Sequence, residues 1–262
     1  MNDSGAERNR LIAVCGKGGV GKTVFTALAA RVLLESGKAG KLLLIDADPA
    51  MGLPSALGVE VSRTMGQVRE EIIETARNAT EEDKLQLADR IDYLTLQALT
   101  EKEAFSLLAM GRTEARGCYC PVNTLLRGAI ELLSVSFDTI LIDGEAGLEQ
   151  LQRQVMQGVD LLILVSDPST RGLRTVAAIS EMVHKDAALR CRRVGVVFNR
   201  IQDSPEALIA WAERAGLEVL GWIPQDENIS RHDFSGKPLT ELPAATPALA
   251  AVQRIFETRV LS

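Results

Sequence analysis

The chain has 262 residues, a length that fits one large α/β domain with a core that needs no disulfide or structural metal. Its composition, with 46% hydrophobic, 24% charged and 4% aromatic residues, is that of an ordinary globular protein. The net charge is −6 and no block of Lys and Arg stands out, which disfavours non-specific nucleic-acid binding. No apolar run reaches the ~18–20 residues that a membrane-spanning helix needs, so we expect no membrane partner.

The first ten residues, MNDSGAERNR, are polar and do not have the pattern of a signal peptide. We therefore expect a cytoplasmic protein in which residues 1–9 are flexible. Four cysteines are present: Cys15, Cys118, Cys120 and Cys191. In a reducing compartment, a close cysteine pair is more typical of a metal or redox site than of a structural disulfide.

Apolar runs alternate with helical patterns, which indicates βαβ units around a parallel sheet. Most of the predicted strands are continuous Val, Ile and Leu runs, as expected where helices cover both faces. The predicted strands are 11–15, 42–46, 92–97, 138–142, 160–165, 193–198 and 218–222. The predicted helices lie near 22–36, 65–88, 122–135, 170–187, 204–215 and 246–259. We therefore expect a single domain, 1–262, of the α/β class, with a doubly wound, mostly parallel sheet of about seven or eight strands flanked by helices.

A glycine-rich motif follows the first predicted strand and fits G-x-x-x-x-G-K-[ST]. Its glycines let backbone N–H groups turn inward around an anion, and the following helix N-terminus adds its dipole. Lys22 is predicted to reach the β- and γ-phosphates, and Thr23 is predicted to ligate Mg²⁺. The residues of this predicted phosphate-binding loop are Gly16, Lys17, Gly18, Gly19, Val20, Gly21, Lys22 and Thr23.

Acidic residues end two other predicted strands. Asp46 and Asp48 belong to the run Asp46-Ala47-Asp48-Pro49, and Asp143 ends the apolar run TILI. Ligands bind at the carboxyl ends of strands in doubly wound sheets, so these acids are expected near the phosphate-binding loop. Asp143 is predicted to hold Mg²⁺ directly or through water. A strand-end aspartate often only caps a helix, so the prediction depends on the acids and the loop occurring together.

Cys118 and Cys120 flank Tyr119 and are followed by Pro121. On a helix their side chains would point about 200° apart, but Pro121 favours an extended conformation in which both can face one metal. A structural zinc site or an iron–sulfur cluster needs about four ligands. A two-fold dimer would supply two cysteines from each subunit. A bare metal ion and a [4Fe–4S] cluster both remain open at this point.

The run KGGVGKT, with Lys17 directly after the first glycine, resembles the deviant phosphate loop of the MinD/ParA/NifH superfamily of dimeric ATPases. The resemblance implies that Lys17 reaches across the dimer to the partner's nucleotide, like an arginine finger supplied in trans. It also implies that Asp48 orients the attacking water and that Asp46 supports the Mg²⁺ region. The implied catalytic residues are Lys17, Lys22, Asp48 and Asp143.

The same resemblance places an asparagine and a proline-containing segment against adenine, which favours ATP or ADP over a guanine nucleotide. An amide side chain can donate and accept hydrogen bonds at once, as recognition of a base edge requires. The residues implied in base binding are Asn199, Arg200, Pro224 and Asp226.

Over roughly residues 10–225 the chain is also similar to the CooC family, the accessory ATPases for nickel insertion into carbon monoxide dehydrogenase. The similarity is carried by KGGVGKT, DADP, Met110-Gly111, Gly117-Cys118-Tyr119-Cys120-Pro121, the run Leu141-Ile142-Asp143 and, after Gly144, the run EAGLE. It implies an ATP-promoted homodimer that assembles a Ni²⁺ or Zn²⁺ site from Cys118 and Cys120 for a carbon monoxide dehydrogenase client. Gln150 stands where family members often carry a histidine, which leaves the metal-transfer step and the exact client open.

Two other readings stay open. A NifH-like electron-transfer protein would hold a [4Fe–4S] cluster with the same four thiolates. A positioning ATPase of the MinD/ParA type would need an amphipathic membrane-binding tail or a basic DNA-binding face. The C-terminal run PALAAVQRIFETRV is amphipathic, but only two arginines lie on its polar side, so we expect it to pack on the sheet.

Overall fold

An eight-stranded sheet, in the order β3-β4-β2-β5-β1-β6-β7-β8, organises the protein. The computed structural model describes residues 10–78, 87–112, 128–144, 158–185 and 191–261. Neighbouring strands are parallel except at one edge, where β3 runs antiparallel to β4. The strands are β1 (Arg10–Gly16), β2 (Leu42–Asp46), β3 (Thr100–Glu101), β4 (Ser106–Ala109), β5 (Thr139–Asp143), β6 (Val159–Ser166), β7 (Cys191–Ile201) and β8 (Glu218–Pro224). The predicted doubly wound, mostly parallel α/β sheet is confirmed.

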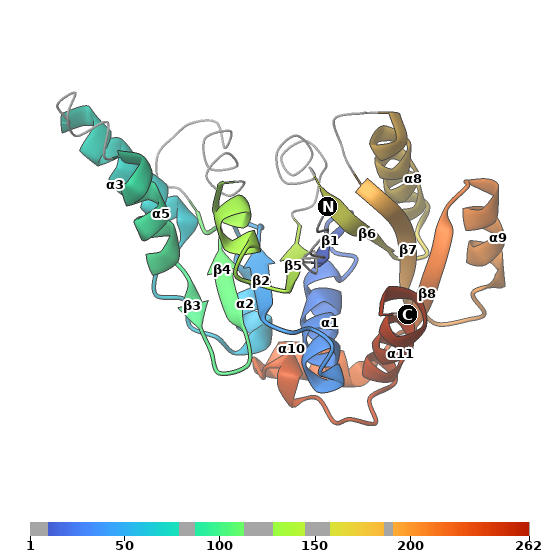
Figure 1. Cartoon of the computed structure of the whole chain (residues 1–262). Helices are drawn as coiled ribbons and strands as arrows, with labels where there is room; N and C mark the ends of the chain where they lie inside the picture. Colours follow the sequence, from blue (N-terminus) through green and yellow to red (C-terminus); the bar gives the residue numbers. More distant parts are fainter. Residues whose placement is uncertain (1–9, 79–86, 113–127, 145–157, 186–190, 262) are drawn as a thin grey trace, which may run out of the picture.

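Helices cover both faces of the sheet, as Figure 1 shows. Alternate residues of β1 enter different cores: Leu11 and Ala13 face one, while Ile12 and Val14 face the other. This alternation is why the strand reads as a continuous apolar run. The first core is closed by α3 (Met65–Asn78), α5 (Leu87–Gln97), α8 (Thr170–Lys185) and α9 (Glu206–Arg214). The second core is closed by α1 (Lys22–Ser36), α2 (Gly52–Leu57) and α11 (Pro247–Ile255).

The strand predicted at 92–97 is wrong, because this segment is the last part of α5. Leu94, Thr95 and Ala98 are buried while Tyr93 and Leu96 are exposed, which is a helical and not an alternating pattern. The strand that occupies this place in the sheet is β4, whose four residues SLLA are too short to stand out in the sequence. It pairs with β2, so that Leu44 lies opposite Leu107.

The predicted helices 22–36, 170–187 and 204–215 correspond to α1, α8 and α9, with changes of a few residues at the ends. The helix predicted at 65–88 begins at Met65 as expected and is described to Asn78. Of the helix predicted at 122–135, the described part is helical over 128–134. Among the described residues, the α-helices α2 and α10 (Glu227–Ser235) and most of α5 lie outside the predicted helices.

The C-terminal helix packs on the sheet through its apolar side, as predicted. It comprises α11 and a wider helical turn, Phe256–Val260. Its buried residues are Ala248, Leu249, Val252, Ile255 and Phe256, and the Phe256 ring lies 6.3 Å from the Phe25 ring of α1. Among the described residues, no helix is long and apolar enough to cross a membrane.

The sheet positions the candidate site because the carboxyl ends of its parallel strands lie at the same end of the sheet. The carboxyl end of β1 leads into the phosphate-binding loop, and β2 and β5 end at Asp46 and Asp143. The register places Asp46 directly opposite Asp143 and Val14 opposite the same Asp143. Three separated segments therefore meet at one place.

Candidate functional site

The phosphate-binding loop joins β1 to α1, and the lysine at its end, Lys22, is buried. Lys22, the first residue of α1, is only 7% exposed, and its ammonium group donates to the carbonyl oxygen of Lys17 at 3.3 Å. A buried ammonium needs such a partner, or an anion in its place. The loop thus holds a cation at the N-terminus of a helix, where anions bind most readily.

Two glycines of this loop allow close contacts that a side chain would block. A Cβ on Gly16 would lie 2.2 Å from the carbonyl oxygen of Val165 in β6. Gly21 has φ +90°, and a Cβ there would lie 2.5 Å from Nδ2 of Asn199. The loop is therefore packed tightly between β6 and the end of β7, which fixes its backbone.

Asp46 is fully buried and organises the turn that follows β2. Its Oδ1 accepts from the backbone N–H of Asp48 and its Oδ2 from that of Leu53 in α2, each at 2.9 Å. Burial raises the pKa of Asp46 from 3.8 to about 7, and the negative charge of Asp143 adds to the rise. Two N–H donors oppose this shift without cancelling it.

Asp143 is the acid with a free oxygen. It is 1% exposed, and its Oδ1 accepts from the Thr26 hydroxyl at 3.1 Å, whereas its buried Oδ2 has no hydrogen-bond partner in the described structure. Burial raises the pKa of Asp143 from 3.8 to about 6, although hydrogen bonding from Thr23 and Thr26 and the charge of Lys22 oppose the rise. An unpaired buried oxygen beside a second buried acid is an environment that a hard divalent cation would satisfy. These residues fit Mg²⁺.

Asp48 lies at the mouth of the site, half-buried. Its Oδ1 accepts from the backbone N–H of Ala50, which shapes the turn before α2. Its negative charge acts on both Asp46 and Asp143 and contributes to their raised pKa values. The structure therefore brings the three predicted acids, together with Lys22 and Thr23, to one place.

Asn199 is buried at the end of β7 and holds the phosphate-binding loop. Its Nδ2 donates to the carbonyl oxygen of Val20 at 2.8 Å, and its Oδ1 accepts from the backbone N–H of Arg200 at 2.9 Å. Arg200 itself is exposed and adopts a left-handed φ of 59°. Both ends of the amide have protein partners, so contact with a base stays a prediction for this pair.

Pro224 is the last residue of β8, and Asp226 lies two residues after it. The Oδ1 of Asp226 accepts from the backbone N–H of Asn228, capping α10, and its Oδ2 accepts from that of Ala248 at the start of α11. Pro224 is half-buried and pairs with Ile201 in the sheet. The carboxylate of Asp226 thus joins two helices, and its predicted contact with nucleotide remains untested.

The cysteine pair Cys118/Cys120 and Gln150 lie outside the described residues. Cys15 is buried, and burial raises the pKa of its thiol from 9.0 to about 12. Burial also raises the pKa of Cys191. Neither is therefore a ready thiolate ligand. Within the described ranges, no three His, Cys, Asp or Glu side chains are grouped as metal ligands.

Thr26 is the site residue that sequence reasoning missed. It lies beyond the motif, three residues after Thr23, and its side chain is fully buried. The signal in the sequence is a polar residue in the apolar run of α1, facing the same way as the motif's own lysine at i−4. Its contact with Asp143, 117 residues away, could not be read from the sequence.

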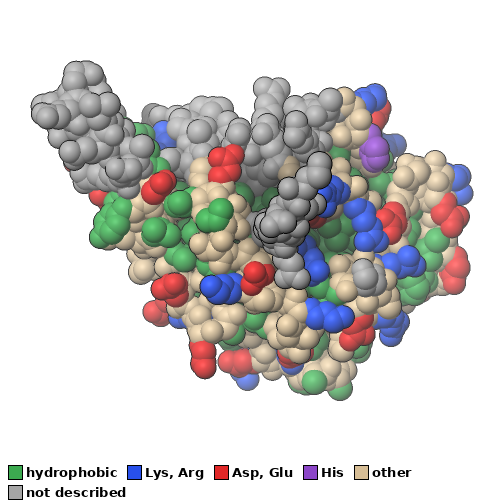
Figure 2. Space-filling view, viewed as in Figure 1, with side chains coloured by type: hydrophobic (Ala, Val, Ile, Leu, Met, Phe, Trp, Pro, Cys, Tyr) green, Lys and Arg blue, Asp and Glu red, His purple; other side chains and the backbone are tan. Residues whose placement is uncertain are grey.

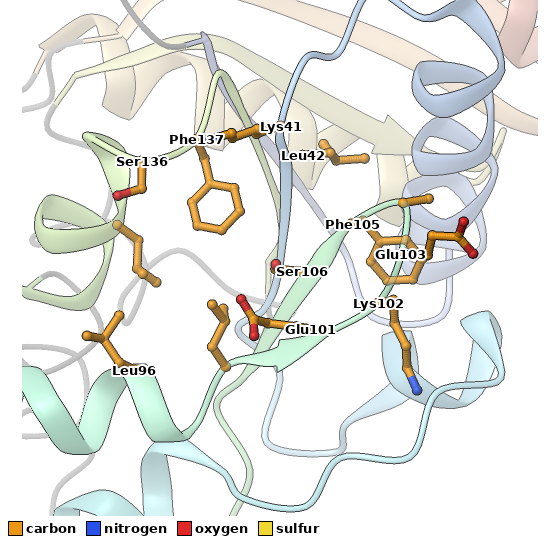
Figure 3. A pocket seen from close by; sticks show the side chains of 13 residues that line it. Lys41, Leu42, Leu96, Glu101, Lys102, Glu103, Phe105, Ser106, Ser136 and Phe137 are labelled. Carbon is orange, nitrogen blue, oxygen red and sulfur yellow. The ribbon is translucent and has the colours of Figure 1, made fainter.

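A cavity of about 430 Å³ opens at the opposite end of the sheet, where β2, β4 and β5 begin. In Figure 3, the side chains of Leu96, Phe137 and Glu101 point toward its centre and Lys102 points away. Figure 2 shows apolar side chains gathered over this part of the molecule, and acidic and basic side chains interspersed elsewhere on the same face. The five-residue strand β2 separates the cavity from the acid pair by about 13 Å, so the two sites are distinct.

With this geometry in place, comparison with known proteins identifies the family. The model of the CobQ/CobB/MinD/ParA nucleotide binding domain matches residues 11–239. The chain belongs to this family. The family model spans the phosphate-binding loop, both acidic strand ends and Asn199, and the predicted nucleotide-binding, MinD-type fold is confirmed.

Relatives match along nearly the whole chain. An uncharacterized ATP-binding protein of Methanocaldococcus jannaschii is 39% identical over 252 residues, which are 94% of this chain and 97% of its own. The carbon monoxide dehydrogenase accessory protein CooC of Rhodospirillum rubrum is 31% identical over 246 residues, covering 89% of this chain and 90% of its own. The septum site-determining protein MinD of Pyrococcus horikoshii, solved as a complex with Mg-ADP, has a TM-score of 0.70 and 26% identity, with 97% of each chain covered.

Proposed function

We propose that this protein is an ATP-hydrolysing metallochaperone that dimerises with ATP and assembles a nickel or zinc site from Cys118 and Cys120. The site geometry supports the nucleotide part of this proposal. The metal part is supported by the Cys118-Tyr119-Cys120-Pro121 sequence and by the relative CooC, a carbon monoxide dehydrogenase accessory protein. A nickel enzyme of that type is the proposed client.

One observation carries the ATPase half: Asp46 and Asp143 lie opposite each other in register, both buried, behind a loop that carries Lys22 and Thr23. Mg²⁺, when bound, would supply charge neutralisation of the phosphates and of the developing transition state. Thr23 and Asp143 would hold the ion, and Lys22 would turn from the Lys17 carbonyl to the β- and γ-phosphates. Asp48 would orient the attacking water from the mouth of the site.

Lys17 is proposed to act in the partner subunit's site. Its half-buried position at the start of the loop suits a cation that is presented outward, while Lys22 is directed inward. The γ-phosphate would then favour the dimer, and its loss would release it. An isologous dimer would bring Cys118 and Cys120 of both subunits together as four thiolates.

The proposal is tested by metal analysis of the full-length protein with sizing chromatography, with and without a non-hydrolysable ATP analogue. Wild-type protein is expected to bind about one Ni²⁺ or Zn²⁺ per dimer, and a Cys118→Ser/Cys120→Ser variant to lose it, because the double substitution removes all four proposed thiolate ligands of the dimer. Cys191→Ser is the matched control, which should keep the metal. A double variant that dimerises with full metal content would refute the cysteine site. Stoichiometric iron and sulfide with a brown chromophore after anaerobic reconstitution would instead indicate an iron–sulfur protein.

The solved MinD structure supports a second candidate, a positioning ATPase of the MinD/ParA type. Such a protein must bind a membrane or DNA in its ATP state. Co-sedimentation with anionic liposomes and retention on DNA, each with ATP analogue and with ADP, separate the candidates. Analogue-dependent binding without metal would favour the positioning ATPase, and metal without either binding would favour the metallochaperone.

A further inference from the structure

Thr26 lies in the second turn of α1, outside the phosphate-binding motif, and is fully buried. Its Oγ1 is 3.0 Å from the carbonyl oxygen of Lys22 and 3.1 Å from Oδ1 of Asp143. The side chain therefore bridges the residue that would bind phosphate and the residue that would bind the cation. These two residues are 121 positions apart in the chain but are joined by this one hydroxyl.

A hydroxyl has one proton, so it can donate to only one of these two oxygens at a time. The stronger acceptor is an ionised carboxylate, because a charge-assisted hydrogen bond is roughly twice as strong as a neutral one. When Asp143 is charged, the Thr26 proton therefore points to Oδ1. The other oxygen of that carboxylate, Oδ2, is buried and has no hydrogen-bond partner in the described structure.

We propose that Thr26 is a positioning residue for the Mg²⁺ site: its hydroxyl fixes Oδ1 of Asp143 and leaves Oδ2 available to the cation. The proposal rests on the use of Asp143 as a magnesium ligand, as proposed above. Removing a residue that hydrogen-bonds to a metal ligand and so orients it generally weakens metal binding by about 10- to 100-fold.

The competing explanation is that Thr26 only bonds back to the Lys22 carbonyl within its own helix. Threonines that bond to the carbonyl at i−4 are neutral or slightly destabilising for a helix. In that case valine, which has the same shape and no proton to donate, would leave the cation site unchanged. The two explanations therefore differ in cation affinity and not in the stability of the fold.

The test measures how Mg²⁺ tightens binding of mant-ADP, a fluorescent ADP, to the full-length protein. The affinity is determined in EDTA and across a Mg²⁺ titration for wild type, Thr26→Val and Thr26→Ser. In Thr26→Val, the affinity in EDTA should stay within about threefold of wild type, and the Mg²⁺ concentration for half-maximal tightening should rise about 10- to 100-fold. Thr26→Ser keeps the hydroxyl and should stay within about threefold of wild type in both.

A Thr26→Val protein with wild-type Mg²⁺ dependence would overturn the proposal. If the valine variant does not fold, Thr26→Ala removes the same donor without adding a methyl group and carries the same expectation. Asp143→Ala separates this inference from the proposed site itself. Unchanged Mg²⁺ dependence in Asp143→Ala would mean that the carboxylate is not the ligand. Loss in Asp143→Ala with wild-type behaviour in Thr26→Val would refute only the role of Thr26.

Discussion

At the scale of single residues, the site is built from charges that the fold holds at a cost. Asp46 and Asp143 are both buried, with pKa values raised to about 7 and about 6. Such carboxylates are more stable protonated, or beside a cation, than charged and alone. In the nucleotide-free protein at neutral pH, the buried negative charge therefore lowers stability at the place where Mg²⁺ is proposed to bind.

Because this cost arises only when the carboxylates are ionised, the stability of the folded protein should depend on pH. The pKa of Asp143 rises on folding from 3.8 to about 6, so the folded state binds the proton more tightly and loses stability as pH increases across that window. Asp143→Asn cannot ionise and escapes the loss. In the absence of nucleotide and Mg²⁺, the variant should melt several degrees above wild type at pH 8 and close to it at pH 4, in thermal unfolding followed by circular dichroism.

Asp92→Asn, at an exposed helix position, is the matched control and should follow wild type at both pH values. Equal melting temperatures of Asp143→Asn and wild type at pH 8 would show that the ionised carboxylate of Asp143 does not destabilise the protein. Asp46→Asn is less informative, because both oxygens of Asp46 accept backbone hydrogen bonds that an amide would only partly replace.

Some residue roles could be predicted from sequence and others could not. The position of the glycine-rich loop between β1 and α1 could be predicted, because its motif is local and its strand and helix flank it directly. The internal partners of Asn199 and Asp226 could not be predicted, since Val20 and Ala248 are 179 and 22 positions away in the chain. Nor could Thr26, because its partner Asp143 lies on another strand.

At the scale of elements, Asp226 connects two helices that sequence patterns treat as separate. Replacing it with alanine removes the cap of α10 and leaves the buried N–H of Ala248 unpaired. We expect Asp226→Ala to lower the free energy of unfolding by about 2–4 kcal/mol in urea titrations. Affinity for mant-ADP should stay within about threefold, since both carboxylate oxygens have protein partners.

Asp226→Asn serves as the control, because its side-chain oxygen can still cap α10. It should lose less stability than the alanine variant. If Asp226→Ala instead kept wild-type stability and lost nucleotide affinity more than about tenfold, the predicted nucleotide contact would be supported over the structural one.

Element prediction worked where the apolar run was long and failed where it was short. The strands β1, β2, β5, β6, β7 and β8 each contain several Val, Ile or Leu residues, and each was predicted within a few residues. The last part of α5 was mistaken for a strand because DYLTLQ is short and contains Tyr, Leu and Thr, although its buried residues follow helical spacing. The four-residue β4 was missed for the opposite reason: it gains its place by pairing with β2 and not by its own pattern.

At the scale of the whole molecule, nucleotide and Mg²⁺ should act on stability together. A ligand at 100 times its Kd stabilises the protein to which it binds by about 2.7 kcal/mol. For a chain of this size that corresponds to a rise in melting temperature of roughly 5–10 °C. We expect a rise of this order in thermal unfolding with Mg-ADP, and a clearly smaller one with ADP and EDTA, because ADP alone leaves the acids uncompensated.

Asp143→Ala gives the control for this linkage. The melting temperature of this variant should rise by the same amount with ADP and Mg²⁺ as with ADP and EDTA. Identical shifts of the wild-type protein under both conditions would contradict a cation site at the acid pair, whatever the metal bound elsewhere.

The pairing of Asp46 with Asp143 has a consequence for how this protein can diverge. The two acids are placed by hydrogen-bonded strand register, not by the segments that continue from β4 after Ala109 and from β5 after Asp143. The strand register, and not the sequence that follows each strand, therefore sets the relative position of the two acids. Natural variation can thus alter the function of a relative while the acid pair is kept. Relatives that share the acid pair and the loop need not share the Cys118-Tyr119-Cys120 sequence.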